Sequence, residues 1–128
     1  MYRTDKKVDY DKLKALFDGV GWTDKTDDIN RLKAMVDNSQ IVVTAWDGDV
    51  MIGFARCLTD YVFNGQINNV VVDSKYRRNG IGKALIKKIL DSSKQVTYIL
   101  RGDIENEKFY RGIGFEASPI SLIYKRKG

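Results

Sequence analysis

A glycine-rich, cationic segment that follows an apolar run is the part of this sequence best suited to chemistry. It is Arg77-Arg78-Asn79-Gly80-Ile81-Gly82-Lys83, and it follows Val70-Val71-Val72 after a short polar stretch. The glycines open an amphipathic pattern that predicts a helix, whose first N–H groups have no partner within the helix. These N–H groups, the helix dipole and the cationic side chains attract anions, which predicts a phosphate or pyrophosphate cradle. The alternative is that the glycines only give clearance for packing the helix against a strand.

Two common nucleotide-binding motifs do not fit this segment. A P-loop has a glycine five residues before its Gly-Lys pair and a Ser or Thr after it, but Arg77 and Ala84 stand there. A dinucleotide fingerprint needs a third glycine at the position of Leu85. The spacing therefore excludes both nucleotide folds and leaves a different kind of cradle.

The Arg-x-x-Gly-x-Gly form of residues 77–82 resembles the acyl-CoA-binding motif of the GCN5-related N-acetyltransferase (GNAT) superfamily. A second segment, residues 108–116 (KFYRGIGFE), resembles the Phe-Tyr-x-x-x-Gly-Phe segment of the same superfamily. The two occur in the expected order, with a helix pattern and a strand pattern between them. The resemblance covers about residues 40–115 and implies the GNAT fold, acetyl-CoA as co-substrate and N-acetyltransferase activity.

The resemblance also implies roles for individual residues. The cofactor-binding residues would be Val70, Val71, Val72, Arg77, Arg78, Asn79, Gly80, Ile81, Gly82, Lys83 and Tyr110. Backbone N–H groups of Arg77 through Lys83 would hold the CoA pyrophosphate, and the strand 70–72 would part from its neighbour to pair with the pantetheine arm. The catalytic residues would be Val70, whose amide polarises the thioester carbonyl, and Tyr110, which protonates the departing thiolate. Asp103 stands where many members have asparagine.

The reaction that this implies is direct acetyl transfer to a primary amine within a ternary complex, which needs proximity more than an elaborate catalyst. We expect a small-molecule amine; the alternatives are a protein or peptide amine, or a non-catalytic CoA-binding regulatory module. Residues 54–63 and 69–72 also resemble a branch that includes plant-type serotonin acetyltransferases, which implies an aromatic amine. Asp60, Asn69 and Asp73 are candidates for a general base, although each could equally be a turn or capping residue.

Several apolar side chains have two interpretations. Trp22, Tyr61 and Phe63 could line the acceptor pocket or pack in the core and hairpin, whereas Trp46 is expected in the core. Cys57 is expected to be a small buried hydrophobic residue.

Composition limits the remaining function classes. The chain has 128 residues, no histidine, one cysteine and a formal net charge of +5, which fits one domain spanning 1–128 with no His-ligated metal and no His-based catalysis. The positive charge suits the phosphates of CoA, and the scattered basic residues make nucleic-acid binding the weakest reading. No signal-like N-terminus and no apolar run of about 20 residues occur, so we expect a cytoplasmic protein without membrane contact.

Periodicity predicts a layered α/β domain with a central, mostly antiparallel mixed sheet flanked by helices. A helix over 8–17 is capped by Asp9, and a second begins at about Asp27. The other expected elements are an edge strand at 2–4, strands at 41–46, 50–58, 66–73 and 96–100, helices from Gly80 and over 105–111, and one or two strands within 115–125. The C-terminal strands could offer an edge for a homodimer.

Overall fold

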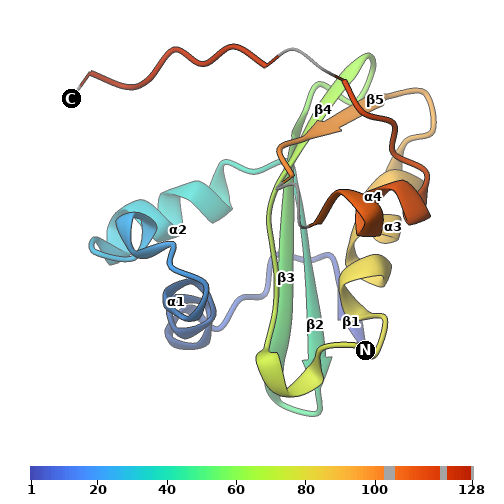
Figure 1. Ribbon diagram of the computed structural model, residues 1–128. Helices are drawn as coiled ribbons and strands as arrows, with labels where there is room; N and C mark the ends of the chain where they lie inside the picture. The colour runs from blue at the N-terminus through green and yellow to red at the C-terminus, as the bar shows by residue number, and fades with distance from the viewer. Residues whose placement is uncertain (103–105, 119–120, 128) are drawn as a thin grey trace.

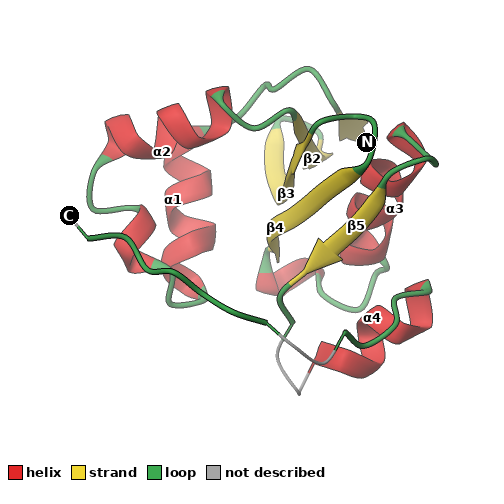
Figure 2. Cartoon of the chain, turned by 90° about the horizontal axis from the view of Figure 1, so that it is seen from above, coloured by secondary structure: helices red, strands yellow, loops and turns green. Residues whose placement is uncertain are grey.

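A five-stranded sheet divides two helical layers in this computed structural model, which describes residues 1–102, 106–118 and 121–127 (Figures 1 and 2). The strands are β1 (Tyr2–Arg3), β2 (Ile41–Asp47), β3 (Val50–Thr59), β4 (Asn64–Val72) and β5 (Thr97–Leu100). They lie in sequence order; β1 to β4 pair antiparallel, and β5 pairs parallel with β4. The predicted mostly antiparallel mixed sheet is therefore confirmed.

The helices cover opposite faces of this sheet, as Figure 2 shows. One layer is α1 (Tyr10–Gly19) and α2 (Ile29–Asp37), with the short 3-10 turn η1 (Thr23–Lys25) between them. The other is α3 (Ile81–Ser92) and α4 (Glu107–Ile113), and a second 3-10 turn, η2 (Ser74–Tyr76), precedes α3. The Asp9 side chain accepts the Lys12 N–H at the start of α1, as the sequence predicts. The cap of α2 is Asp28, so this helix begins slightly later than expected.

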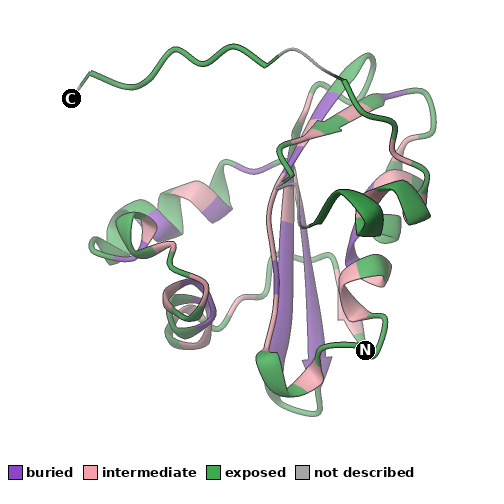
Figure 3. Cartoon of the chain, viewed as in Figure 1, coloured by how far each residue is buried: buried purple, intermediate pink, exposed green. Residues whose placement is uncertain are grey.

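Two hydrophobic cores hold the layers together, and alternate residues of the strands contribute to them. Figure 3 shows that the central strands are largely buried between the helical layers. Phe54 packs with α1 and α2, whereas its neighbour Ala55 packs with α3. Trp46 lies in the first core, where its Nε1 donates to Thr44 Oγ1 at 2.8 Å, as expected of a core tryptophan. Cys57 is fully buried in the second core, and burial raises the pKa of its thiol to about 11.

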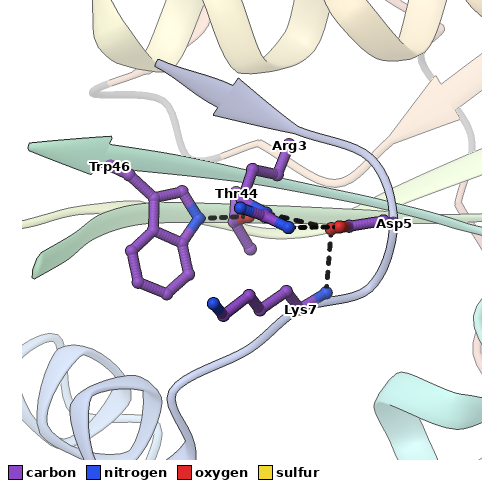
Figure 4. A network of polar contacts seen from close by, with 5 residues as sticks. All are labelled: Arg3, Asp5, Lys7, Thr44 and Trp46. Atoms are coloured by element: carbon purple, nitrogen blue, oxygen red, sulfur yellow. Dashed lines mark hydrogen bonds and ion pairs between the residues drawn. The ribbon is translucent and has the colours of Figure 1, made fainter. Parts of the chain in front are cut away.

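The N-terminal segment is fastened along the edge of β2, and Figure 4 shows the contacts. Tyr2 pairs with Ala45 in the short edge strand that the sequence predicts. Arg3 forms an ion pair with Asp5, whose carboxylate also accepts the Lys7 backbone N–H. The Lys7 ammonium lies 6.0 Å from the centre of the Trp46 ring. These contacts cover one edge of the sheet.

The prediction of strands within 115–125 is wrong for the part of that segment that the structure describes. Residues 115–118 and 121–127 form no strand; after α4 the chain leaves the sheet (Figure 1). Phe115 packs against the Tyr110 ring, but Leu122 and Tyr124 are almost fully exposed. An apolar, β-branched segment becomes a strand only where a sheet edge supplies hydrogen bonds, and this segment meets none. No helix among the described residues is long and apolar enough to span a bilayer.

The close approach of β4 and β5 depends on a glycine. Gly65 lies opposite Tyr98, and a Cβ at Gly65 would come within 2.7 and 2.9 Å of the Tyr98 ring. We expect Gly65→Ala to lower the free energy of unfolding by about 1–3 kcal/mol through overpacking, measured by urea denaturation. Gly19→Ala is the control, because a Cβ at Gly19 meets no atom within 4 Å; it should leave stability unchanged or raise it by up to about 1 kcal/mol. Equal effects of the two substitutions would contradict the role of Gly65.

Candidate functional site

The C-terminal half of β4 departs from regular sheet pairing on both sides. Its parallel pairing with β5 runs from Asn64 to Ile67 and goes no further. Its pairing with β3 shifts by one residue between Asn68 and Val71, where Asn69 adopts a left-handed conformation with φ of 54°. This irregularity is a β-bulge, which bends the strand and increases its twist. The stretch from Asn68 to Val72 is therefore left without a β5 partner, as the predicted parting of this strand requires.

A cavity of about 540 Å³ opens where β4 and β5 diverge. All of the predicted cofactor-binding residues line it except Asn79, which is exposed in the loop before Gly80. The sequence pattern also predicts that Val70 to Val72 are buried on both faces. Of the three, only Val71 is buried. Val70 and Val72 are half-buried, and all three residues line the cavity. The same residues thus serve as sheet and as cavity wall.

The start of α3 has the features of an anion cradle. Gly80 precedes the helix with φ of 76°, and no described side chain caps the first-turn N–H groups. Arg78 also has a positive φ of 71°, a conformation that costs a non-glycine residue about 1–3 kcal/mol and is concentrated at ligand sites. Arg77, Arg78 and Lys83 bring positive charge to the same rim of the cavity. The backbone and the side chains here both favour a phosphate-bearing ligand.

Gly82 distinguishes the cradle from simple helix–strand clearance. A Cβ at Gly82 would lie 3.6 Å from Phe109 Cζ and 3.8 Å from Val72 Cγ2, both ordinary contact distances. The packing of α3 therefore tolerates a side chain at this position, while any side chain there would project into the lined cavity. A glycine at residue 82 is better explained by room for a ligand than by packing.

The loop between β4 and α3 is fastened at its start and near its middle. Asp73 lies directly after β4, and its carboxylate accepts from Lys12 Nζ of α1 at 2.6 Å and from the Lys75 backbone N–H at 3.0 Å. The Tyr76 hydroxyl donates to Asp47 Oδ2 at 2.6 Å. The bond from Lys12 lowers the pKa of Asp73 most, and that from Lys75 adds to it. Sequence reasoning missed Lys12, since its partner lies far along the chain and no local pattern joins the two.

The candidate general bases are all engaged in structural contacts, and none lines the cavity. Asp60 Oδ1 accepts the backbone N–H groups of residues 62, 63 and 64, which lower the pKa of this carboxyl. Asp73 is paired with Lys12, as described above. The Asn69 side-chain oxygen accepts from Arg56 Nε at 2.8 Å. The capping and turn interpretation of both carboxylates is therefore the one that the contacts support.

Tyr110 is positioned beside the cavity by ring contacts. It lies on α4, edge-on to Phe109 and Phe115 with ring centres 5.1 and 6.0 Å apart. A Cβ at Gly102 would come within 3.2 Å of the Tyr110 ring, so this glycine leaves the room that the ring occupies. Asp103 lies outside the described residues. No cluster of three or more potential metal ligands occurs in the described part of the chain.

Of the aromatic candidates for an acceptor pocket, Trp22 reaches the cavity. Its ring stacks edge-on against Phe17 with centres 5.1 Å apart, and it lines the cavity from the side of α1. Tyr61 donates its hydroxyl to the Gln40 carbonyl, and Phe63 is 72% exposed; neither lines the cavity. Sequence reasoning did not single out Val20, Tyr76, Asn106 or Phe109, which also line the cavity. Of these, only Phe109 could have been found from the sequence, because it lies inside the second motif, residues 108–116.

Known proteins resemble this chain in sequence and in fold. A family model described as "Acetyltransferase (GNAT) family" matches residues 8–115. Histone acetyltransferase TAP1 of Glycine max is 36% identical over an alignment of 129 positions, which covers 90% of this chain and 55% of that protein. A GNAT-family acetyltransferase structure from Streptococcus pneumoniae TIGR4 has a TM-score of 0.81 at 25% identity, covering 100% of this chain and 98% of that one. An aminoglycoside 6′-N-acetyltransferase complexed with coenzyme A shares the fold, with a TM-score of 0.71, 18% identity and coverage of 89% and 83%. The chain spans about half the length of the plant relatives that it matches.

The Lys12–Asp73 ion pair predicts a pH-dependent contribution to stability. Asp73→Asn removes the charge but keeps a side-chain oxygen for the Lys75 N–H. Because the native-state pKa of Asp73 is lowered, the pair stabilises fully above the ordinary value of 3.8 and is lost as the pH falls through the lowered value. We expect the wild type to be more stable than the variant at about pH 7 and this difference to shrink as the pH falls below 3.8, the ordinary value, measured by urea denaturation from neutral to acid pH. Lys12→Met should reproduce the loss at neutral pH, and a difference that persists undiminished in acid would contradict the assignment.

Proposed function

Because the chain belongs to the acetyltransferase (GNAT) family, we propose that it transfers an acetyl group from acetyl-CoA to a primary amine. The observation that carries this proposal is the uncapped, glycine-rich start of α3 at the rim of a cavity that continues along the end of β4, on the side where β4 has no β5 partner. A ligand with a pyrophosphate at one end and an extended amide chain at the other has the shape and chemistry of that path. CoA has both.

The cradle would hold the pyrophosphate of CoA. The N–H groups at the start of α3 face an anion with the positive end of the helix dipole behind them. Arg77, Arg78 and Lys83 at the rim add charge, and the net charge of +5 favours the approach of a polyanion. The left-handed backbone at Arg78 and Gly80 turns the loop around the position that the phosphates would take.

The end of β4 that has no β5 partner would bind the pantetheine arm and the thioester. Backbone groups between Asn68 and Val72 have no partner on β5, so an extended amide chain can pair with them as a strand would. The Val70 N–H would then stabilise the negative charge that develops on the thioester oxygen. The bulge at Asn69 sets the direction of the residue that follows it.

The reaction needs one nucleophile and two proton transfers. The neutral amine attacks the thioester carbon, the carbon–sulfur bond breaks, and the CoA sulfur leaves as a thiolate. Tyr110, on the cavity wall, would give its proton to that sulfur, and the new amide would release the amine proton to water. Holding the two substrates together supplies much of the rate enhancement in such a reaction.

We propose a small-molecule amine as the acceptor. Val20 and Trp22 close the cavity on the side of α1, which suits a compact substrate with an apolar part. The name of the Glycine max relative, a histone acetyltransferase, favours a lysine side chain of a protein as the second candidate. Acetylation of free amines compared with that of a lysine-containing peptide separates the two.

The cradle predicts that a charged side chain at residue 82 prevents cofactor binding. Gly82→Glu should abolish calorimetric binding of acetyl-CoA, because the carboxylate would occupy the phosphate position and repel it. Gly82→Ala should weaken binding by about tenfold or less, since the added methyl fits the protein but enters the cavity. Gly19→Glu, with the same charge change in open space on α1, should retain binding. A wild type that does not bind acetyl-CoA would overturn the proposed function.

Substitution of Tyr110 distinguishes two hypotheses, an acetyltransferase and a CoA-binding regulatory module without turnover. Tyr110→Phe keeps the ring contacts with Phe109 and Phe115 and removes the acidic hydroxyl. In an enzyme, kcat should fall by about 100-fold or more while the Kd for acetyl-CoA changes little. Turnover is followed as thiol release and binding by calorimetry. Equal kcat in the two proteins would remove Tyr110 from the mechanism, and a wild type that binds acetyl-CoA but releases no thiol with any amine would favour the regulatory module.

A further inference from the structure

Arg56 is a half-buried cation whose hydrogen-bond partners among the described residues are neutral. It lies on β3, on the face of the sheet that Phe54 presents to α1 and α2. Its Nε donates to Asn69 Oδ1 at 2.8 Å, and its Nη1 donates to Ser39 Oγ at 3.5 Å. Within residues 1–102, 106–118 and 121–127, the ion pairs involve other cations, and no carboxylate lies within 4.0 Å of Arg56. The guanidinium is thus partly withdrawn from water without a counter-ion.

The unused donors of Arg56 remain accessible. Nη2 makes no hydrogen bond with the described residues, and no described side-chain nitrogen or oxygen is both buried and unpaired. Nη2 therefore lies in contact with solvent. Burial lowers the pKa of this guanidinium, which reflects the cost of keeping its charge partly desolvated. An anionic ligand at the accessible edge would offset that cost, and a carboxylate matches the fork of a guanidinium.

Arg56 lies next to the proposed point of acetyl transfer. It pairs across the sheet with Asn68, and its hydrogen bond to Asn69 places it one residue from Val70 on the cavity wall. Helix α3, whose first turn forms the cradle, lies on the other face of the sheet, as Figure 2 shows. Acetyl-CoA would approach the reacting carbon from the α3 side, so the amine must come from the side of α1 and α2. Arg56 faces that side.

We propose that Arg56 binds a carboxylate of the amine acceptor, so that the acceptor is a small amino-acid-like molecule rather than a simple amine. This inference rests on the proposed acetyltransferase function. The polar neighbours favour it: Gln66 donates to Asn68 at 3.2 Å, and both side chains, like Asn69 and Ser39, are uncharged. No described acidic group competes for the guanidinium. The rival explanation is that Arg56 only braces the bulge through Asn69.

Matched pairs of acceptors separate the two explanations. Tyramine and tyrosine, tryptamine and tryptophan, and cadaverine and lysine each differ by one carboxylate. The readout is the ratio of kcat/KM for the carboxylate member to that for its neutral partner, because damage to the fold lowers both values together. We expect the wild type to favour the carboxylate member in at least one pair. Arg56→Gln should reduce that ratio by about 10- to 100-fold, the range for a lost charge-assisted hydrogen bond.

Two further variants serve as controls. Asn69→Gly removes the bond from Arg56 Nε but keeps the guanidinium and permits the left-handed backbone, so the ratio should persist even if both rates fall. Arg56→Lys retains the charge without the fork and should restore part of the ratio, which also covers a poorly folding Arg56→Gln protein. A bracing role alone predicts that Arg56→Gln and Asn69→Gly lower both members of each pair equally.

The outcomes also separate this inference from the proposed function. A wild-type protein that acetylates amines without preference for the carboxylate member, or a preference that survives Arg56→Gln, overturns the assignment of Arg56 alone. Failure of the wild type to bind acetyl-CoA in calorimetry overturns the acetyltransferase proposal and this inference with it.

Discussion

The divergence of β4 from β5 is the constraint on which the candidate site depends. Two parallel strands that stayed paired to their ends would satisfy each other's backbone groups and leave no room between them. Here the pairing ends at Ile67 and Leu100, and the bulge at Asn69 bends β4 away as it continues to Val72. Unpaired backbone groups in a protein interior cost free energy. The same groups can hydrogen-bond an extended ligand, and the cavity lies along them.

The surrounding elements hold this gap in shape. On one side, α3 packs its apolar face into the second core, which fixes the position of its uncapped first turn relative to β4. On the other side, α1 contributes Lys12, which holds Asp73 at the end of β4. Gly65 lets Tyr98 approach closely, so the two strands are tightly joined just before they part. The sheet is therefore tightly packed up to the point at which it opens, which favours a preorganised site.

Charge is distributed unevenly around this gap. Arg77, Arg78 and Lys83 collect at the rim of the cavity where phosphates would lie. Arg56 lies on the opposite face with neutral partners. The carboxylates near the ends of the central strands are used for structure: Asp60 closes a turn, and Asp73 joins the loop to α1. This arrangement leaves the α3 face suited to a polyanion and the other face suited to a single anionic group.

Much of the local structure was predictable from the sequence, because local structure depends on neighbours along the chain. The cap at Asp9 and the glycine-rich start of α3 are short-range patterns. The two motifs were sufficient to place one set of residues around one cavity: Val70 to Val72, Arg77, Arg78, Gly80 to Lys83 and Tyr110. Tertiary structure alone decided the rest. The strand expected after Phe115 fails because no sheet edge reaches it, and the pairs Lys12–Asp73 and Arg56–Asn69 exist because folding brings distant side chains together. Spacing along a chain carries no record of such contacts, since they depend on the register and twist of the whole sheet.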